Sequence, residues 1–258
     1  MLLAVDIGNT SIALGVYRGK SLVLQGRIAT RLISHKEDLK EKIKCFFSET
    51  KENLCIKNII ISCVVPPLKK IIMDGFQEIF SISPCYLETK DIKEIKIDYP
   101  SSSEIGIDRI VNAVAAVKLY QPPIIIVDSG TAITFDVISK EGVYLGGTIA
   151  PGIEISMIAL SEKAKMLPRI KLSQAKTIMG IDTVSSIESG IYFGFKYLME
   201  GIMERIKQEL NILPFIVMTG GLSEIYRKEV LGINVINLYL TLEGLRIIHE
   251  NRLSTSCG

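Results

Sequence analysis

Short apolar runs, separated by glycine and polar residues, occupy the start of the chain and predict β-strands. Residues 2–8 (LLAVDIG) predict a first strand, 11–19 (SIALGVYRG) its antiparallel partner and 21–30 (SLVLQGRIAT) a third, with Gly19 at the turn before it. The continuous apolar run at 58–65 (NIIISCVV), which two prolines close, predicts a strand buried on both faces.

The second half of the chain repeats this order of elements. The segments that predict strands there are 122–130 (PPIIIVDSG), 132–139 (AITFDVIS), 144–152 (YLGGTIAPG) and 215–221 (FIVMTGG). Asp6 and Asp128 lie about half a chain apart, and each ends an apolar strand, precedes an x-Gly turn and is followed by a second strand. The repeat predicts an α/β chain with two domains, residues 1–115 and 116–258.

Three segments space their apolar residues at helical intervals, which predicts amphipathic helices. The segments and their stripes are 35–50 with Leu39, Ile43, Phe46 and Phe47; 99–120 with Ile107, Ile110, Val111, Val114 and Val117; and 185–210 with Ile187, Ile191, Phe195, Leu198, Ile202, Ile206 and Leu210. Ser101 and Glu104 have capping-box spacing, so Asp108 is expected in the first or second turn of its helix, beside the junction of the halves. We expect the longest helix to bury its stripe against the second sheet or a partner chain.

Composition narrows the classes of protein that fit these elements. Hydrophobic residues make up 48% of the 258, yet no apolar run reaches the roughly 18 to 20 residues that a membrane helix needs, and the N-terminus has no cationic lead-in of a secretory signal. The net charge is +2 and the basic residues are scattered, so nucleic acid is an unfavourable partner. We therefore expect a cytoplasmic protein that binds neither membrane nor nucleic acid.

The cysteines are odd in number and never closer than eight residues, which excludes a C-x-x-C metal knuckle and makes a disulfide framework unfavourable. They are Cys45, Cys55, Cys63, Cys85 and Cys257. We expect mostly buried thiols.

The two Asp-x-Gly turns carry the candidate chemistry. A glycine turn between strands lets backbone N–H groups approach an oxyanion, and an aspartate at the strand end can bind the metal cation that accompanies phosphate. One such turn is more often an ordinary structural turn, but two in matching contexts favour binding opposite sides of one nucleotide triphosphate. The glycine-rich strand ends at 146–152 (GGTIAPG) and 219–221 (TGG) lie where α/β domains gather their binding sites, although Gly-Gly also marks close packing.

In its motifs the chain resembles the type III pantothenate kinases. DIGNTSIA, SCVVPPL, GIDRIVNAVAA, DSGTAITFD, GGTIAPGI, AKMLP, TGGL and LTLEGL occur in that family's order between residue 1 and about 248, and GIDR with DSGTA and GGTIAPG is the most specific part. The resemblance implies two tandem ribonuclease-H-like domains of the actin, hexokinase and Hsp70-like ATPase superfamily. It also implies a homodimer that phosphorylates pantothenate with ATP, Mg²⁺ and a monovalent cation (K⁺ or NH₄⁺), which opens coenzyme A synthesis.

The resemblance assigns the nucleotide and metal residues. The first phosphate loop comprises Asp6, Ile7, Gly8, Asn9, Thr10, Ser11, Ile12 and Ala13. Within it Asp6 binds Mg²⁺, and Asn9 and Thr10 donate to phosphate oxygens. Asp128 corresponds to the monovalent-cation ligand and Thr131 to a nucleotide contact, and hard oxygen ligands suit such cations.

The resemblance also assigns the substrate residues. Asp108 corresponds to the catalytic base and Arg109 to a clamp for the pantothenate carboxylate, within a substrate segment that includes Gly106 and Ile107. From spacing alone, Asp108 is an acid favoured by the helix dipole and Arg109 a solvated surface residue. The remaining substrate contacts are Tyr99, which precedes a proline, and Thr183, which contacts pantothenate from the other subunit; the local alternative for Thr183 is an N-cap.

Two positions depart from the family pattern, and two other functions stay open. Ile133 replaces a second threonine in the turn, which weakens its polar lining, and Lys163 replaces a threonine before Leu-Pro. One alternative is a non-catalytic accessory factor for transcription. The other is a kinase of the same superfamily with another acceptor, such as a sugar, or a polyphosphate hydrolase.

Overall fold

The computed structural model of the chain describes residues 1–48, 50, 52, 54–227 and 229–255. It contains two compact units: Met1–Lys118 together with the chain from Tyr239 onward, and Leu119–Leu238. The first boundary lies close to the predicted one after residue 115. The C-terminal segment, which we predicted in the second domain, lies in the first unit, because its helix α6 (Leu240–Thr255) packs on strands β1, β2 and β4.

The first unit is a sheet with the strand order β3-β2-β1-β4-β5. Its strands are β1 (Leu2–Ile7), β2 (Ser11–Arg18), β3 (Ser21–Ala29), β4 (Asn58–Cys63) and β5 (Cys85–Tyr86), and β6 (Lys96–Ile97) follows in the sequence. β1 is antiparallel to β2 and parallel to β4. Gly19, at the β2–β3 turn, has a positive φ of 58°, so glycine suits this turn. The four strands predicted in this half of the chain are confirmed.

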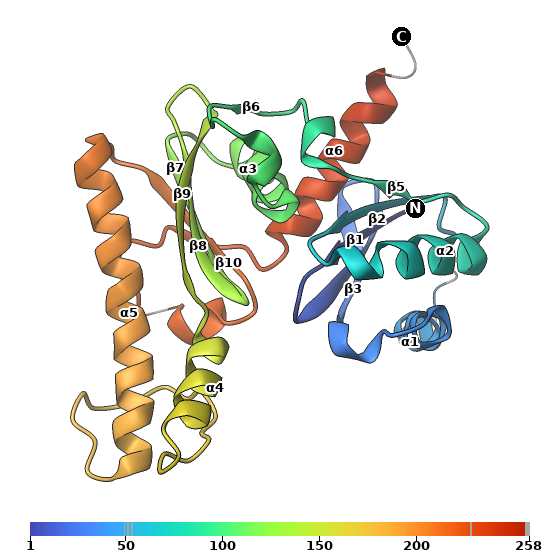
Figure 1. Cartoon of the computed structure of the whole chain (residues 1–258). Coiled ribbons are helices and arrows are strands. Elements are labelled where there is room, and N and C mark those ends of the chain that lie inside the picture. The colour runs from blue at the N-terminus through green and yellow to red at the C-terminus, as the bar shows by residue number, and fades with distance from the viewer. Residues whose placement is uncertain (49, 51, 53, 228, 256–258) are drawn as a thin grey trace. The chain divides into compact units, whose positions relative to one another are not determined.

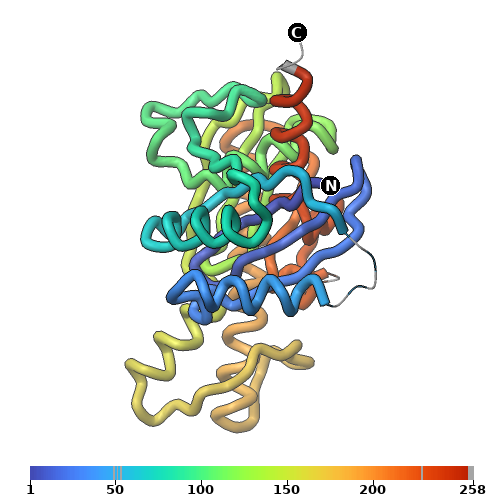
Figure 2. Tube along the Cα trace, turned by 90° about the vertical axis from the view of Figure 1, so that its right-hand side faces the viewer, coloured from blue at the N-terminus to red at the C-terminus, as the bar shows by residue number. Residues whose placement is uncertain are grey.

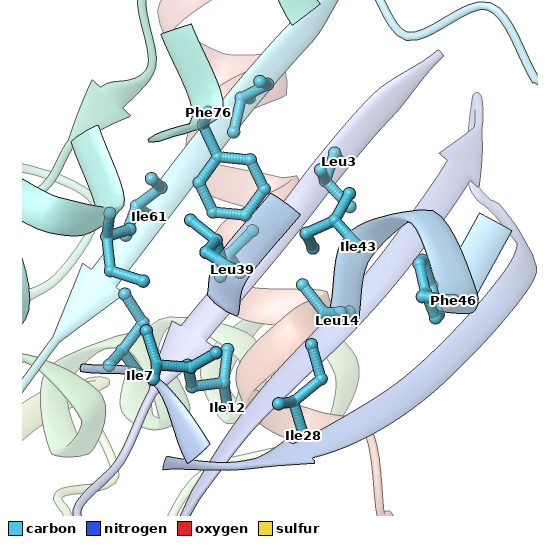
Figure 3. Close-up of a cluster of buried hydrophobic side chains, with 14 of the residues drawn as sticks. Leu3, Ile7, Ile12, Leu14, Ile28, Leu39, Ile43, Phe46, Ile61 and Phe76 are labelled. Carbon is cyan, nitrogen blue, oxygen red and sulfur yellow. The ribbon is translucent and has the colours of Figure 1, made fainter. Parts of the chain in front are cut away.

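One face of this sheet forms the core with helices α1 (Lys36–Ser48) and α2 (Lys69–Phe80). Side chains alternate along β1, so Leu3, Val5 and Ile7 point into this core while Asp6 points to the other face. Figure 3 shows Leu3 and Ile7 beside the helix residues of the cluster. The two helices run side by side (Figure 2). The helix predicted at 35–50 is thus confirmed as α1.

The second unit repeats the strand order of the first, reading β9-β8-β7-β10-β11. Its elements are β7 (Ile124–Ser129), β8 (Ala132–Ile138), β9 (Val143–Pro151), α4 (Ile153–Lys163), α5 (Thr183–Leu210), β10 (Phe215–Thr219) and β11 (Val235–Ile236). β7 takes the place of β1, with β8 antiparallel to it and β10 parallel to it. The duplication predicted from the two aspartates is therefore a property of the fold.

The long helix α5 runs along one face of the second sheet (Figure 1). Tyr192, Phe195, Met199 and Met203 are its buried apolar residues. Of the predicted stripe, only Phe195 is buried; Ile187, Ile191, Leu198, Ile202 and Ile206 are half-buried, and Leu210 is exposed. The row that faces the sheet is therefore displaced by part of a turn from the predicted stripe.

Helix α3 (Ile107–Leu119) begins later than the capping-box spacing indicated. Ser102–Glu104 form a separate 3-10 turn, and the Ser101 side chain makes no capping hydrogen bond. Ile105 is extended, and its carbonyl accepts a hydrogen bond from the Thr89 hydroxyl at 3.1 Å, which separates the turn from the helix. The predicted capping box was wrong, while the prediction that Asp108 lies in the first or second turn is confirmed, since it lies in the first turn.

The thiols also differ from expectation. Among the described cysteines, Cys63 is buried, Cys85 is half-buried, and Cys45 and Cys55 are exposed, so the prediction of mostly buried thiols was wrong; Cys257 lies outside the described residues. Residues 251–255 continue α6. No helix within the described ranges is long and apolar enough to cross a membrane.

Candidate active site

Asp6 lies near the end of β1, on the sheet face opposite the α1–α2 core. In the strand register it stands beside Ala13 on β2 and Ser62 on β4. The Ser62 hydroxyl donates a hydrogen bond of 2.7 Å to Oδ1 of Asp6. The side chain is thus held at the end of the strand, where the chain turns through Gly8.

Asp6 and Asp108 lie close enough to influence each other's charge, and both belong to the first unit. Burial, and next the Asp108 carboxylate, raise the pKa of Asp6 to about 7, although the Ser62 hydrogen bond and the Arg27 charge oppose this. Burial also raises the pKa of Asp108, against the hydrogen bond from the Arg109 backbone N–H. Two carboxylates with raised pKa values at one place are typical of a functional site and favour a bound cation.

The loop after Asp6 is fixed by hydrogen bonds to its own backbone. The Gly8 N–H donates to the Ser11 carbonyl at 3.0 Å. The Thr30 hydroxyl donates to the Gly8 carbonyl at 2.7 Å, and the Thr30 N–H donates to the Thr10 carbonyl at 3.0 Å. Asn9 and Thr10 are exposed at the tip. The loop is therefore rigid at its base and open to a ligand at its tip.

Several residues assigned to binding have side chains that face the core instead. Ile7, Ile12 and Ile107 are buried, and Figure 3 shows Ile7 and Ile12 within the apolar cluster. Only their backbone groups can reach a ligand. Ser11, by contrast, accepts a hydrogen bond of 3.4 Å from the exposed Arg27, and Ala13 shares the face of Asp6.

The segment around Asp108 shows why a glycine precedes it. A Cβ at Gly106 would lie 2.5 Å from Oδ1 of Asp108, so only glycine leaves room for the carboxylate in this position. Arg109 is half-buried in the first turn of α3, and Tyr99 is 41% exposed. Gly106, Asp108 and Arg109 are thus together at one helix end.

In the second unit, Asp128 occupies the position on β7 that Asp6 occupies on β1. Its register neighbours are Thr134 on β8 and Thr219 on β10. Gly220 has a φ of +94°, and a Cβ there would lie 2.6 Å from Oδ1 of Asp128. The TGG motif thus lets the backbone approach the carboxylate closely, which a side chain would prevent.

A second glycine supports the loop after Asp128. The Gly130 N–H donates to the Ala132 carbonyl at 3.1 Å. A Cβ at Gly152 would lie 2.0 Å from the Thr131 carbonyl oxygen, so the start of α4 packs directly on this loop. Ile133 is fully buried in the core with α5 and faces away from Asp128, so this departure leaves the polar lining unchanged. Gly152 belongs to GGTIAPG, so that motif and DSGTA meet in one loop.

Thr183 is the first residue of α5 and is exposed. The N-cap is Asp182, whose side chain accepts from the Ser185 N–H at 2.9 Å, so the alternative of a Thr183 cap was wrong. Thr183 lines an open cavity of about 660 Å³ with residues of α4 and the segment before α5, among them Leu160, Leu167 and Ile181.

The sequence of the chain matches a known protein family. The family model described as type III pantothenate kinase matches residues 2–205. The chain belongs to the type III pantothenate kinase family. A type III pantothenate kinase of Syntrophus aciditrophicus is 41% identical over 251 residues, covering 97% of this chain and 99% of that protein.

Solved structures of more distant proteins share the fold of this pantothenate kinase chain. A Campylobacter jejuni protein assigned to the Baf family of transcriptional activators has a TM-score of 0.61 at 21% identity, covering 98% and 99% of the two chains. Spiroplasma citri MreB 5 bound to AMPPNP has a TM-score of 0.53 at 13% identity, covering 98% and 97%. At such identities the likeness shows the fold alone, which is that of the actin and hexokinase-like ATPases.

Sequence reasoning missed two side chains at the kinase's first carboxylate. Ser62 holds Asp6, and Thr30 holds the loop after it. Ser62 lies in the SCVVPPL motif, and its parallel register with Asp6 was the available signal. The equivalent register position in the second unit is Thr219, again a hydroxyl residue.

The donors of the kinase's first unit fit a magnesium ion. Among the described residues, no group of three or more histidine, cysteine or acidic side chains is placed to hold a metal. Mg²⁺ does not need such a cage, because it is usually held by one or two carboxylates, water and substrate phosphates. Asp6, a carboxylate near Asp108 that the Ser62 hydroxyl holds in place, fits that role.

Proposed function

We propose that this protein is a cytoplasmic kinase that transfers the γ-phosphoryl group of ATP to the primary hydroxyl of pantothenate. The product is 4′-phosphopantothenate, and the reaction opens coenzyme A biosynthesis. Family membership supports the reaction. The observation that carries it is the pairing of Asp6, at the end of β1 beside a glycine loop, with Asp108 at the start of α3, close enough to raise the pKa of Asp6.

The residues around Asp6 suit the phosphate end of ATP. The backbone N–H groups and the side chains of Asn9 and Thr10, at the tip of the loop, donate to phosphate oxygens. Asp6 would hold Mg²⁺, which neutralises negative charge on the phosphates when bound. Ser62 keeps the Asp6 carboxylate in one orientation through its 2.7 Å hydrogen bond.

Asp108 acts on the acceptor alcohol. Its carboxylate orients the hydroxyl and takes its proton as the oxygen bonds to the γ-phosphorus, while the bond from that phosphorus to the bridging oxygen breaks and ADP leaves. A pKa raised by burial makes Asp108 a stronger base than an exposed aspartate. Arg109 pairs with the pantothenate carboxylate through its planar fork, and Gly106, Ile107 and Tyr99 line the substrate.

In the second unit, Asp128 would hold the monovalent cation, K⁺ or NH₄⁺, and Thr131 would contact the nucleotide. The support is the hard oxygen chemistry of a strand end against which the backbone at Gly220 and Gly152 packs closely.

We also propose that the protein works as a homodimer in which Thr183 reaches the partner's pantothenate. The surface around the Thr183 cavity supports this, because it exposes large apolar side chains that a monomer would leave in water. They are Ile155, Ile158, Leu160, Met166, Ile178, Met179, Ile181 and Val184. Met166 and Ile181 are each 95% exposed.

The reaction is tested by incubating the purified protein with ATP, Mg²⁺, K⁺ and pantothenate. We expect 4′-phosphopantothenate by mass, with ADP formed in equal amount and only when pantothenate is present. ADP without that product would indicate another acceptor or a hydrolase. Absence of ADP under every acceptor tested would favour the non-catalytic accessory factor.

The shared site predicts that two inactive variants restore activity to each other. Asp108→Asn removes the base, and Thr183→Phe fills the cavity that receives the partner's substrate. After coexpression, each mixed dimer has one intact site out of two, so the purified mixed dimer should show about half of the wild-type activity. The measurement is ADP release by the doubly tagged, mixed dimer.

Each variant alone, purified as a dimer of wild-type size, is the control for this mixing experiment. A mixture no more active than its components would mean that each site is built from one chain.

A further inference from the structure

Helix α6 packs on the sheet face that carries Asp6. The register places Gly15 and Tyr17 on this face with Asp6. A Cβ at Gly15 would lie 3.0 Å from Cδ1 of Leu242, and the Tyr17 hydroxyl donates to Oε1 of Glu243 at 3.2 Å. The start of α6 is thereby fixed against β1 and β2.

Arg246 strengthens this docking from within α6. The residue is 5% exposed, and its Nη2 and Nε donate to Oε2 of Glu243 at 2.7 and 3.0 Å. Its Nη1 donates to Oε2 of Glu250 at 2.8 Å. The carboxylate that accepts from Tyr17 is therefore held in place by a buried cation.

The same part of α6 contacts α3 with almost no space between the backbones. A Cβ at Gly244 would lie 2.2 Å from the carbonyl oxygen of Val111. Glycine inside a helix costs about 1 kcal/mol relative to alanine. The close approach of α3 is the feature of the structure that requires glycine here.

One polar contact fixes the register of the two helices. The Thr241 hydroxyl donates a hydrogen bond of 2.7 Å to Oδ1 of Asn112. Asn112 is 1% exposed and is the one polar side chain among the buried residues of α3 in the described structure. A buried amide is costly to leave without partners, so this contact resists sliding of α3 along α6.

Asn112 lies four residues after Asp108, one turn along the same face of α3. We propose that Thr241 and Asn112 are positioning residues for the phosphoryl transfer, which set the place of Asp108 relative to Asp6 through α6. Since α6 is docked on the Asp6 sheet face and α3 is docked on α6, the helix sets the distance between the two carboxylates. The inference rests on the proposed function, because it assigns Asp108 the role of base.

Thr241→Val tests the proposal, because valine keeps the shape and removes the donor to Asn112. A misplaced base slows chemistry without weakening substrate binding, so kcat should fall about 10- to 100-fold while the KM values for ATP and pantothenate stay within about twofold. Thr241→Ser, which restores the hydroxyl, should recover most of kcat. Hydrogen exchange should show faster opening of the first two turns of α3 in Thr241→Val.

Tyr226→Phe is the control, because it removes one buried hydroxyl hydrogen bond, 3.4 Å to the Tyr192 carbonyl, that involves neither α3 nor α6. It should lower the melting temperature, as Thr241→Val does, and leave kcat unchanged. Three results overturn the proposal: a wild-type kcat in Thr241→Val, an equal loss of kcat in Tyr226→Phe, or unchanged exchange in α3. A wild-type protein that makes no 4′-phosphopantothenate contradicts the proposed function instead, and the exchange measurement still decides the inference.

Discussion

Replacing Asp108 with asparagine is expected to lower turnover of pantothenate by about 10² to 10⁴, the usual contribution of a general base. Asparagine keeps the size and can still accept a hydrogen bond from the Arg109 N–H, so the start of α3 should keep its structure. It cannot take the proton of the hydroxyl. The measurement is kcat from coupled ADP release at saturating ATP and pantothenate.

The KM values of this variant separate a role of Asp108 in taking the proton from a role in binding the acceptor alcohol. If the carboxylate only accepts the proton late in the reaction, kcat falls while both KM values stay close to wild type. A turnover within a few fold of wild type, in a variant with unchanged melting temperature, would remove Asp108 from the mechanism. Arg109→Lys is a useful companion, because it keeps the charge and loses the planar fork, and should raise the KM for pantothenate alone.

Strands were predictable from the sequence because their signals are local. β1 to β3 and β7 to β10 each carry their own apolar run or alternation, and glycine or proline lies near most of their ends. Helix α6 shows the limit of such signals, since its place in the first unit depends on contacts with β1, β2 and β4, far away in the sequence. The face that α5 buries depends in the same way on the shape of the sheet beneath it.

In the candidate site, too, the residues with local sequence signals were predictable, and those that depend on distant contacts were not. The motifs located Asp6 and Asp128, and the structure gives them equivalent places in two sheets of the same strand order. Thr30 could not be found, because it acts through backbone contacts that no motif indicates. Ser62 lies in the SCVVPPL motif, but its role depends on the pairing of β4 with β1. The consequence of Ile133 also needed the structure, since period-two alternation decides which face it lies on.

Replacing Asp6 with asparagine is expected to lower turnover at least about 100-fold, on the scale of losing a major electrostatic contribution to the transition state. The neutral amide cannot replace a carboxylate as the ligand of a magnesium ion. Raising Mg²⁺ should recover only part of the loss. The measurement is kcat/KM for ATP across a Mg²⁺ titration, and a wild-type Mg²⁺ dependence would exclude Asp6 as a ligand.

The same variant should be more stable than the wild type at pH 8 when Mg²⁺ and nucleotide are absent. Folding raises the pKa of Asp6 from 3.8 to about 7, so between these values the folded protein keeps a proton that the unfolded chain has lost. The free energy of unfolding of the wild type therefore falls as the pH rises through this window, and the loss is complete above pH 7. The asparagine side chain of the variant does not titrate, so the variant's advantage grows over the same window to on the order of 1 to 3 kcal/mol.

Urea unfolding of both proteins at pH 4, 5.5, 7 and 8 measures this difference. Because every other titrating group is common to the two proteins, the difference between their curves reports Asp6 together with its interaction with Asp108. Asp108→Asn is the control, because it removes the neighbouring charge and should reduce, without abolishing, the fall caused mainly by burial. Curves for wild type and Asp6→Asn that stay parallel from pH 4 to 8 would mean that Asp6 is solvated like an ordinary surface aspartate, and the cation site proposed around it would lose its physical basis.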